Sequence, residues 1–389
     1  MTVFNTRLVA LASLVLGLHG CHNAVSPDRV VTWTALSAGL WYSCGITSEA
    51  KTFCWGGVPG YRDPIPLKDS LMPMSAIPLR IPSDKGFIDI TVGEDNMCAL
   101  DSLRVAYCWG SNQTGDVGDS SYLAKRGPSR VLGAIRWRAL AGGSSHVCGV
   151  TLDGAAYCWG NQFRGALGNG KADGSSPQPE LVLGGLTFTT VRAGPGYSCA
   201  LTPPGEAYCW GVNDYGLLGD SQPPAPFLYS TSPSHVTGGH RFVTITLGGL
   251  HACAIAIDAR AYCWGWNNYG QLGNGSSAAS SWPVPVSGDL RFVSLTAGYL
   301  HTCGLTADGA GYCWGNNERG QFGTGDTVAA STPQLIASPG TYVTLVAGGR
   351  HTCARTPSGD AFCWGRGDYG QLGDGLLGDR QRPTPVAPP

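Results

Sequence analysis

Seven pairs of cysteines, repeated at a nearly constant interval, constrain the fold of this chain more than any other feature. In each pair the two cysteines are ten residues apart, and the second is followed by Trp-Gly. The pairs are Cys44 with Cys54, Cys98 with Cys108, Cys148 with Cys158, Cys199 with Cys209, Cys253 with Cys263, Cys303 with Cys313, and Cys353 with Cys363. Successive first cysteines are 50 to 54 residues apart. A repeat of this length predicts a propeller blade or another stacked repeat unit.

The composition favours an all-β chain. The 389 residues include 58 glycines and 26 prolines, and only 13% are charged, which is low for helices with a solvated face. The 43% of hydrophobic residues is enough to fill a core, so disorder is excluded. The 25 basic and 26 acidic residues give a net charge of −1, which provides no attraction to nucleic acid. We therefore expect a turn-rich all-β fold that binds no nucleic acid.

Within one repeat, the two cysteines are spaced to face each other across a β-hairpin. Between Cys303 and Cys313, Asp308-Gly309 lies at the midpoint, where the chain must reverse. A three-residue loop ending in a left-handed glycine places residue i opposite residue i+10. Directly opposed residues have Cα atoms about 4.5–5.5 Å apart, which a disulfide accepts. We predict one hairpin disulfide per repeat.

Metal binding is the competing interpretation of these cysteines. The residue two positions before the first cysteine is a histidine in four repeats, namely His146, His251, His301 and His351. The other three repeats have Tyr42, Asn96 and Tyr197 there. A ligand that is missing from three copies of seven does not make a repeated zinc site, and exported thiols would have to stay reduced. We expect hydrogen-bonding histidines, no metal site and no cofactor.

The first 21 residues have the pattern of an export signal. One basic residue, Arg7, precedes an apolar run over residues 8–20 that is too short to span a bilayer. The run ends in Leu18-His19-Gly20-Cys21, which resembles a bacterial lipobox, although His19 departs from the usual small or aliphatic residue. We expect a signal peptide over residues 1–21, lipid on Cys21 and a tether over 22–29, with plain cleavage and secretion as the alternative.

These expectations place the protein outside the cytoplasm. We expect it to be attached to the bacterial cell envelope, at the outer membrane or cell surface, or else to be secreted. The expected membrane contact is through the lipid on Cys21 alone, because no later segment approaches the ~20 apolar residues that a transmembrane helix requires. We also expect a monomer.

A second signature follows Trp-Gly in most repeats. It is clearest at residues 270–273, 320–323 and 370–373, where the sequences are Gly-Gln-Leu-Gly, Gly-Gln-Phe-Gly and Gly-Gln-Leu-Gly. The first repeat departs most, because no such sequence follows Trp55. The order strand-Ala-Gly, His-Thr, Asp-Gly, Trp-Gly and Gly-Gln-Leu-Gly resembles the regulator-of-chromosome-condensation repeat. That resemblance implies a seven-bladed β-propeller over residues 30–389, to which the cysteine pairs are an addition.

The lengths of the two ends indicate how such a ring closes. Between the second cysteine of one repeat and the first cysteine of the next lie 39 to 43 residues. The 26 residues after Cys363 and the 14 residues from 30 to 43 together make one such interval. We therefore expect the N- and C-terminal segments to share one repeat, which ties down the ends of the array.

The sequence contains no constellation typical of an enzyme. Catalysis needs a nucleophile beside a base, or paired carboxylates, at positions that break the repeat. No such set is found, so we expect a non-catalytic binding scaffold. Propeller loops gather on two faces, and binding residues are concentrated on loops of this kind.

The candidate binding face consists of residues that follow Trp-Gly in the repeats. One equivalent loop position is aromatic or arginine in five repeats, and two further tryptophans occur in a single repeat; the full set is Phe163, Tyr215, Trp266, Tyr269, Trp282, Arg319 and Tyr369. These residue types are enriched at binding hot spots. Their alternative role is to pack against neighbouring blades.

Three functional hypotheses follow. The first is an extracytoplasmic module that binds an unknown protein. The second is a binder of cell-envelope glycans or an adhesin, for which Arg366-Gly367-Asp368 is a weak motif. The third, implied by the resemblance alone, is guanine-nucleotide exchange, which an exported location disfavours.

Overall fold

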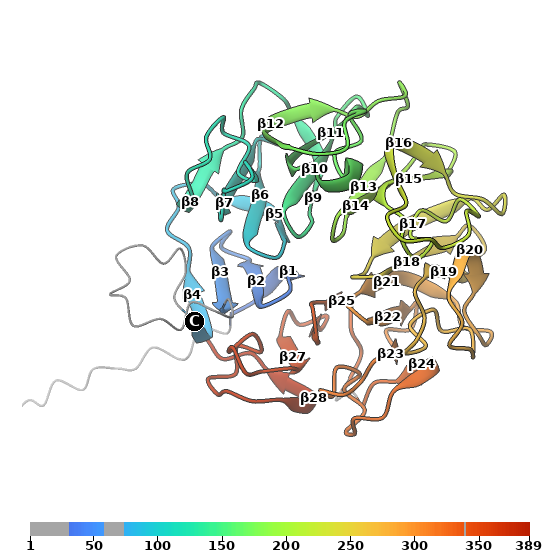
Figure 1. Cartoon of the computed structure of the whole chain (residues 1–389). Coiled ribbons are helices and arrows are strands. Elements are labelled where there is room, and N and C mark those ends of the chain that lie inside the picture. The colour runs from blue at the N-terminus through green and yellow to red at the C-terminus, as the bar shows by residue number, and fades with distance from the viewer. Residues whose placement is uncertain (1–30, 58–73, 338–339) are drawn as a thin grey trace, which may run out of the picture. The chain divides into compact units, whose positions relative to one another are not determined.

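The computed structural model describes residues 31–57, 74–337 and 340–389. The expected signal peptide (1–21), its Cys21 and the tether (22–29) lie outside the described residues. Residues Val31–Pro389 form one compact unit. In that unit the described chain forms seven sheets, each made of four consecutive antiparallel strands, so the seven-bladed β-propeller predicted from the sequence is confirmed (Figure 1).

We number the blades in chain order. Blade 1 contains β1 (Trp33–Ala38), β2 (Tyr42–Thr47), β3 (Thr52–Gly56) and β4 (Ser75–Arg80). Blade 2 contains β5 (Phe87–Val92), β6 (Asn96–Asp101), β7 (Ala106–Gly110) and β8 (Lys125–Arg130). Blade 3 contains β9 (Trp137–Gly142), β10 (His146–Thr151), β11 (Ala156–Asn161) and β12 (Ser175–Leu181), with the short 3₁₀ helix η1 (Phe163–Gly165) between β11 and β12.

The remaining blades repeat this order. Blade 4 contains β13 (Thr190–Ala193), β14 (Tyr197–Leu201), β15 (Ala207–Val212) and β16 (Tyr229–His235). Blade 5 contains β17 (Phe242–Leu247), β18 (His251–Ala256), β19 (Ala261–Gly265) and β20 (Ser280–Pro285). Blade 6 contains β21 (Phe292–Ala297), β22 (His301–Thr306), β23 (Gly311–Gly315) and β24 (Ala330–Leu335). Blade 7 contains β25 (Thr344–Ala347), β26 (His351–Arg355), β27 (Ala361–Gly365) and β28 (Arg380–Pro385).

The ring closes between blade 7 and blade 1, which lie side by side in Figure 1. The backbone N–H of Trp33 donates to the carbonyl of Gly359 at 2.9 Å, and the N–H of Gly349 donates to Gly39 O at 3.1 Å. No described blade combines strands from both ends of the chain. The N- and C-terminal segments thus share one cysteine-to-cysteine interval, as expected. Such an interval runs from the middle of one blade to the middle of the next, so the chain ends meet between two blades.

Each blade places its two cysteines opposite each other in the central hairpin. In blade 6 the N–H of Gly309 donates to Thr306 O at 3.0 Å, with Gly309 at φ +84°, and this turn pairs Cys303 with Cys313. The same register recurs in the other six blades, and every one of these cysteines is buried.

All seven pairs are joined as disulfides, with Cα atoms 4.0–4.1 Å apart. This separation is slightly shorter than the 4.5–5.5 Å expected for directly opposed strand residues. In blade order the bonded pairs are Cys44 with Cys54, Cys98 with Cys108, Cys148 with Cys158, Cys199 with Cys209, Cys253 with Cys263, Cys303 with Cys313, and Cys353 with Cys363.

The hydrophobic core lies between neighbouring blades. Each blade buries the tryptophan that follows its second cysteine, and an aromatic residue near the start of the blade packs on that tryptophan. The seven pairs, with ring centroids 5.5–6.3 Å apart, are Trp33 with Trp55, Phe87 with Trp109, Trp137 with Trp159, Phe188 with Trp210, Phe242 with Trp264, Phe292 with Trp314, and Tyr342 with Trp364. One core cluster joins Tyr197 of blade 4 to Trp264 of blade 5, and another joins Cys363 of blade 7 to Trp33 of blade 1.

The Gly-Gln-Leu-Gly signature forms the seam between blades. In blade 5 the carbonyl of Gln271 accepts a hydrogen bond of 3.0 Å from the indole N–H of Trp314, in blade 6. Gly273 has φ +70°, and a Cβ at this position would lie 2.6 Å from Trp314 Nε1. Only glycine meets both conditions, because other residues disfavour this conformation and their side chains would collide with the indole. The same contact between Gly373 and Trp55 joins blade 7 to blade 1.

Candidate functional site

One face of the ring carries six of the seven candidate binding residues. In a four-stranded antiparallel blade, the turn between the first two strands and the loop between the last two strands lie at the same edge. We call the side of the ring formed by these segments the loop face. Trp41, in the first kind of segment, contacts Tyr369, in the second kind, with ring centroids 5.4 Å apart. The opposite side carries the Asp-Gly hairpin turns, and we call it the hairpin face.

The centre of the loop face is the mouth of the central channel. A cavity of about 100 Å³ lies there, and residues from all seven blades line it. Its wall consists mostly of the Ala-Gly sequences at the ends of the innermost strands, such as Ala38-Gly39 and Ala297-Gly298. Glu94 and Tyr299 add the two titratable side chains of the lining. Among the described residues that line this small mouth, no nucleophile is paired with a base.

Phe163 lies in the first of three aromatic groups on the loop face. The guanidinium of Arg164 lies over the ring of Phe163 at 5.0 Å and over that of Phe227 at 4.8 Å. Arg164 also pairs with Asp214 of the next blade at 2.6 Å. Both rings remain exposed, by 50% for Phe163 and 73% for Phe227. This first group therefore offers two aromatic surfaces held by one half-buried cation.

Three of the predicted residues form the second group, across blades 4 and 5. The ring of Tyr215 lies 6.2 Å from Trp266, and Trp266 lies 5.6 Å from Tyr269. Tyr269 also lines a shallow groove of about 590 Å³ together with Asn268, Ser276 and other small residues of blades 5 and 6. The second group thus continues from a row of aromatic rings into a polar groove.

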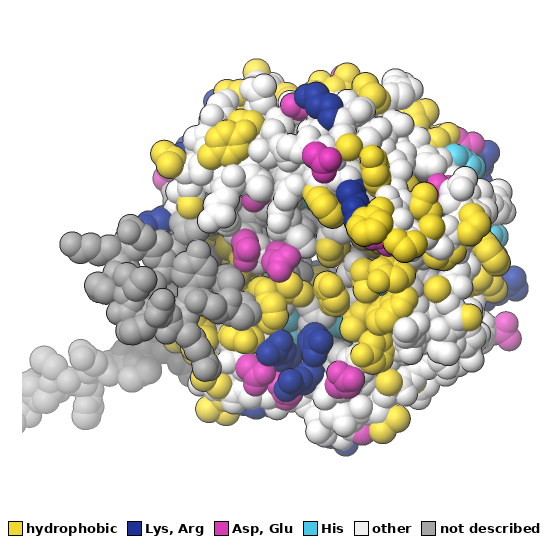
Figure 2. Space-filling model, viewed as in Figure 1, with side chains coloured by type: hydrophobic (Ala, Val, Ile, Leu, Met, Phe, Trp, Pro, Cys, Tyr) yellow, Lys and Arg dark blue, Asp and Glu magenta, His cyan; other side chains and the backbone are white. Residues whose placement is uncertain are grey.

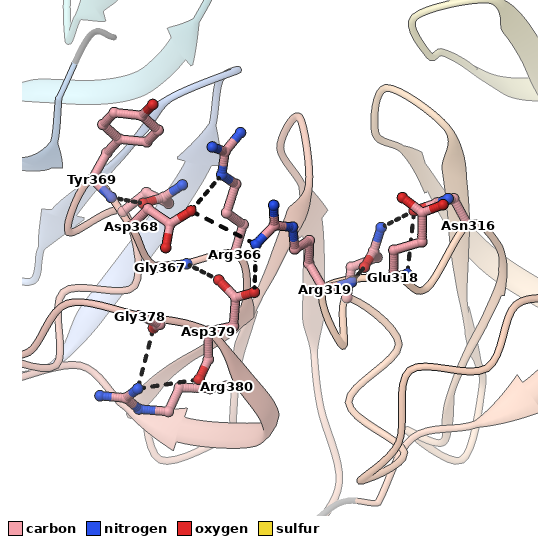
Figure 3. A network of polar contacts seen from close by, with 12 residues as sticks. Asn316, Glu318, Arg319, Arg366, Gly367, Asp368, Tyr369, Gly378, Asp379 and Arg380 are labelled. Atoms are coloured by element: carbon pink, nitrogen blue, oxygen red, sulfur yellow. Dashed lines mark hydrogen bonds and ion pairs between the residues drawn. The ribbon is translucent and has the colours of Figure 1, made fainter.

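Tyr369 and Arg319 belong to the third group, at the boundary between blades 6 and 7 (Figure 3). Arg366 lies 4.9 Å from the ring of Tyr369 and 5.3 Å from that of Trp41. Its Nε donates to Asp368 at 3.1 Å, so the side chains of the Arg-Gly-Asp tripeptide are engaged with each other.

Arg319 links the two blades in this third group. Its Nη1 lies 3.2 Å from Asp379 and 3.8 Å from Asp368. The hydrogen bond and charge of Asp379, followed by the charge of Asp368, raise the pKa of Arg319 above its ordinary value. Arg319 is therefore held by carboxylates of blade 7, which is the packing role that the sequence left open.

Trp282 lies apart from these groups, on the outer strand β20, and it is 53% exposed. Trp41, Arg164 and Phe227 were not selected from the sequence, and Arg366 was selected only as part of the Arg-Gly-Asp motif, although each contributes to one of the groups. For Trp41 a signal existed: it lies in a short turn whose residues differ between the repeats, between the repeated Ala-Gly and the first cysteine.

The four histidines near the cysteines are part of the seams. Burial lowers the pKa of His146 to about 4 and that of the other three to about 3, so all four are neutral hydrogen-bonding groups. The hydroxyl of Thr302, in blade 6, faces His251 and donates a hydrogen bond of 3.0 Å to Gln271 O. Each Nε2 lies 2.7–3.0 Å from a Ser or Thr hydroxyl of the next blade: His146 from Ser198, His251 from Thr302, His301 from Thr352 and His351 from Ser43.

The fold and the loop face together define a class of protein, a seven-bladed β-propeller whose loops present aromatic and charged groups. The model of the RCC1-like domain matches residues 73–389, and the chain belongs to this family. This agrees with the resemblance found in the sequence.

Two curated relatives are similar to part of this chain. The chain is 32% identical to the Arabidopsis thaliana ultraviolet-B receptor UVR8 over 64% of this chain and 56% of the receptor. It is 28% identical to the human E3 ubiquitin-protein ligase HERC2 over 66% of this chain and 5% of the ligase. The chain thus spans a small part of HERC2 and about half of UVR8.

Solved structures show the same fold. Yeast RCC1 (Prp20), in its complex with Kap60, has a TM-score of 0.74 at 20% identity, with 99% of this chain and 91% of that chain covered. Human WBSCR16 has a TM-score of 0.73 at 20% identity, with 81% and 85% covered.

Proposed function

We propose that this protein is an extracytoplasmic, non-catalytic scaffold that binds another protein through its loop face. The observation that carries the proposal is the gathering of aromatic and arginine side chains into three groups on one face, supplied by blades that are far apart in sequence. Such residues supply large contact areas at low entropic cost and dominate binding hot spots. The rigid, disulfide-bonded blades hold them in place before binding, which lowers the cost of association.

Two observations support the extracytoplasmic part of the proposal. Seven disulfides are typical of oxidising compartments. The lipobox-like sequence that ends at Cys21 supplies an export route and an anchor. The one helix among the described residues, η1, has three residues, and none of the described helices has the length and apolar character to cross a membrane.

The relatives suggest a protein partner as well. Kap60 binds yeast RCC1 in the solved complex, and the solved structure of Prp20p from Saccharomyces cerevisiae was described with its binding to Gsp1p and histones. Exchange-factor activity is the corresponding candidate for this chain, but export would separate it from a cytoplasmic GTPase. We therefore favour a partner in the envelope or the secreted fraction.

Glycan binding is the second candidate, and one observation favours it. In the groove of the second group, Tyr269 lies beside Asn268 and three serines, Ser276, Ser277 and Ser331. An aromatic ring beside amide and hydroxyl groups suits a neutral sugar, which stacks on the ring and exchanges hydrogen bonds with the polar groups.

Affinity capture with matched variants tests the proposal. The oxidised chain is immobilised and exposed to envelope and secreted fractions of the source organism. A partner should bind wild type and an Ile257→Ala control on the hairpin face, but not a triple variant, Tyr215→Ala with Trp266→Ala and Tyr269→Ala, that is shown to fold. Loss of the partner on Ile257→Ala alone would refute a loop-face site, and binding to glycan arrays without any protein partner would favour the second candidate.

A further inference from the structure

The seven inner turns of the loop face differ from one another while the residues around them repeat. The two central residues of these turns are Leu40-Trp41, Glu94-Asp95, Ser144-Ser145, Pro195-Gly196, Gly249-Leu250, Tyr299-Leu300 and Gly349-Arg350, in blade order. Blades 7, 1 and 2 are neighbours in the ring, so their turns place a basic, an apolar and an acidic pair in sequence along the channel mouth. Figure 2 shows acidic side chains beside the centre of this face, an apolar area next to them and a group of basic side chains beyond. We call this arrangement the polar stripe.

The basic end of the polar stripe has more positive than negative charge. The N–H of Arg366 donates to Arg350 O at 2.9 Å, so the two arginines lie opposite each other just beyond the paired ends of β26 and β27. Arg366 is partly neutralised by Asp368 and stacks on Trp41. Arg350 is half-buried and forms no ion pair within residues 31–57, 74–337 and 340–389. Its guanidinium is therefore not committed to a carboxylate of the described residues.

The acidic end has the opposite imbalance. Glu94 lines the channel cavity, and Asp95 follows it in the same turn. In the described part of the chain neither carboxylate pairs with a cation, and Asp95 Oδ1 is buried without a hydrogen-bond partner. Burial, and then the neighbouring charge of Glu94, raise the pKa of Asp95. A cation brought to this turn would relieve both effects.

The middle of the polar stripe is apolar and hollow. Leu40 and the Ala-Gly strand ends line the channel cavity of about 100 Å³ beside it. An aliphatic side chain fits a hollow of this kind, because its wall offers small apolar groups.

We propose that the polar stripe receives a projecting loop of a partner protein, which presents a basic side chain to Glu94 and Asp95, an acidic side chain to Arg350 and an aliphatic side chain to the channel mouth between them. Because the two ends of the polar stripe carry opposite charges, the loop can bind in one direction only. A loop with its basic and acidic side chains exchanged would meet like charges at both ends and would be excluded. The proposal rests on the proposed function, since it specifies which chemistry on the loop face selects the partner.

Selection from a phage-displayed library of random disulfide-closed loops tests this proposal on the oxidised full chain. The selected loops should share a basic, an aliphatic and an acidic residue in one order. Affinity of a synthetic selected loop should fall at least about tenfold on Arg350→Glu and, separately, on Glu94→Lys. Arg291→Glu, an exposed arginine on the hairpin face, is the matched control and should leave the affinity within about twofold of wild type, since surface substitutions far from a site change little. A chain with both Arg350→Glu and Glu94→Lys should select loops of reversed charge order.

The outcomes separate this proposal from the proposed function. Failure to select any loop, or selected loops that bind Arg350→Glu and Glu94→Lys as tightly as wild type, would overturn the polar stripe as a docking site. The proposed function would survive that result if a partner were still captured through the second group. It would fail independently if no captured partner depended on the loop face.

Discussion

The seam that closes the ring makes a quantitative prediction for one glycine. Gly373 has φ +70°, and a Cβ there would lie 2.7 Å from Nε1 and 2.8 Å from Cδ1 of Trp55. Gly375 has φ +84°, but the nearest atom to its Cβ would be Ile77 Cγ2 at 3.8 Å, an ordinary contact. Alanine therefore strains the backbone at both positions and collides with a neighbour only at Gly373.

The magnitudes follow from these two terms. Left-handed backbone costs an L-residue about 1–2 kcal/mol, so Gly375→Ala should destabilise by roughly that amount. At Gly373, overpacking adds about 1–3 kcal/mol, because Trp55 is fully buried and packs against Trp33. Displacing Trp55 also weakens its hydrogen bond to Gln371 O, at 3.0 Å. Such a bond contributes about 1 kcal/mol, so the difference between the two variants should be about 2–4 kcal/mol.

Denaturant unfolding of the oxidised protein, followed by tryptophan fluorescence and circular dichroism, measures this difference. If the free energy of unfolding depends equally steeply on denaturant concentration in both variants, the difference between their unfolding midpoints reports the difference in stability. Gly273→Ala is the control for ring closure: it places a Cβ against Trp314 in the same way, but between blades 5 and 6 and not where the ring closes. Equal stability of Gly373→Ala and Gly375→Ala would refute the argument that the Gly-Gln-Leu-Gly signature exists to fit the next blade.

Three further predictions concern single residues. Burial raises the pKa of Asp116 to about 7, so the stability of the folded state that depends on the protonated carboxyl is lost as pH rises from about 4 through 7. In unfolding curves at several pH values, Asp116→Asn should gain stability over wild type across that range, up to roughly 4 kcal/mol. A stability difference that stays constant with pH would contradict this. Burial lowers the pKa of His301 to about 3, so the folded state loses stability as pH falls from about 6.5 to 3. His301→Asn should make the free energy of unfolding less dependent on pH in that range, and an acid transition equal to that of wild type would argue against a neutral histidine at the seam. Ala259 has φ +65° at the hairpin position that Gly309 occupies in blade 6, so Ala259→Gly should relieve backbone strain. The free energy of unfolding should rise by about 1 kcal/mol at most, once the greater entropy of glycine in the unfolded chain is subtracted, and a lower thermal midpoint would contradict the strain.

Much of the fold could be predicted because it is repeated. The ten-residue cysteine spacing and the Asp-Gly midpoint define a hairpin locally, and seven copies define the blades. The split of the ring could not be placed from spacing alone, because the interval between cysteine pairs does not coincide with a blade. The reason for Gly273 was also hidden, since its partner Trp314 belongs to the next blade.

The site was harder to predict than the fold. The aromatic positions after Trp-Gly were visible as repeats, and Tyr215, Trp266 and Tyr269 do come together. Trp41 could not be found by comparing equivalent positions, because its position in the inner turn is not aromatic in the other repeats. The residues of the proposed polar stripe lie where the repeats differ, in the inner turns.

The central claim is that the loop face is the binding surface, and one measurement tests it most directly. The dissociation constant of the captured partner is determined for wild type, Trp266→Ala and Ile257→Ala by surface plasmon resonance. The account predicts a loss of about 30-fold or more for Trp266→Ala, as for a hot-spot tryptophan, and no change for Ile257→Ala. Unchanged binding by Trp266→Ala together with a loss for Ile257→Ala would place the partner on the hairpin face and contradict the account.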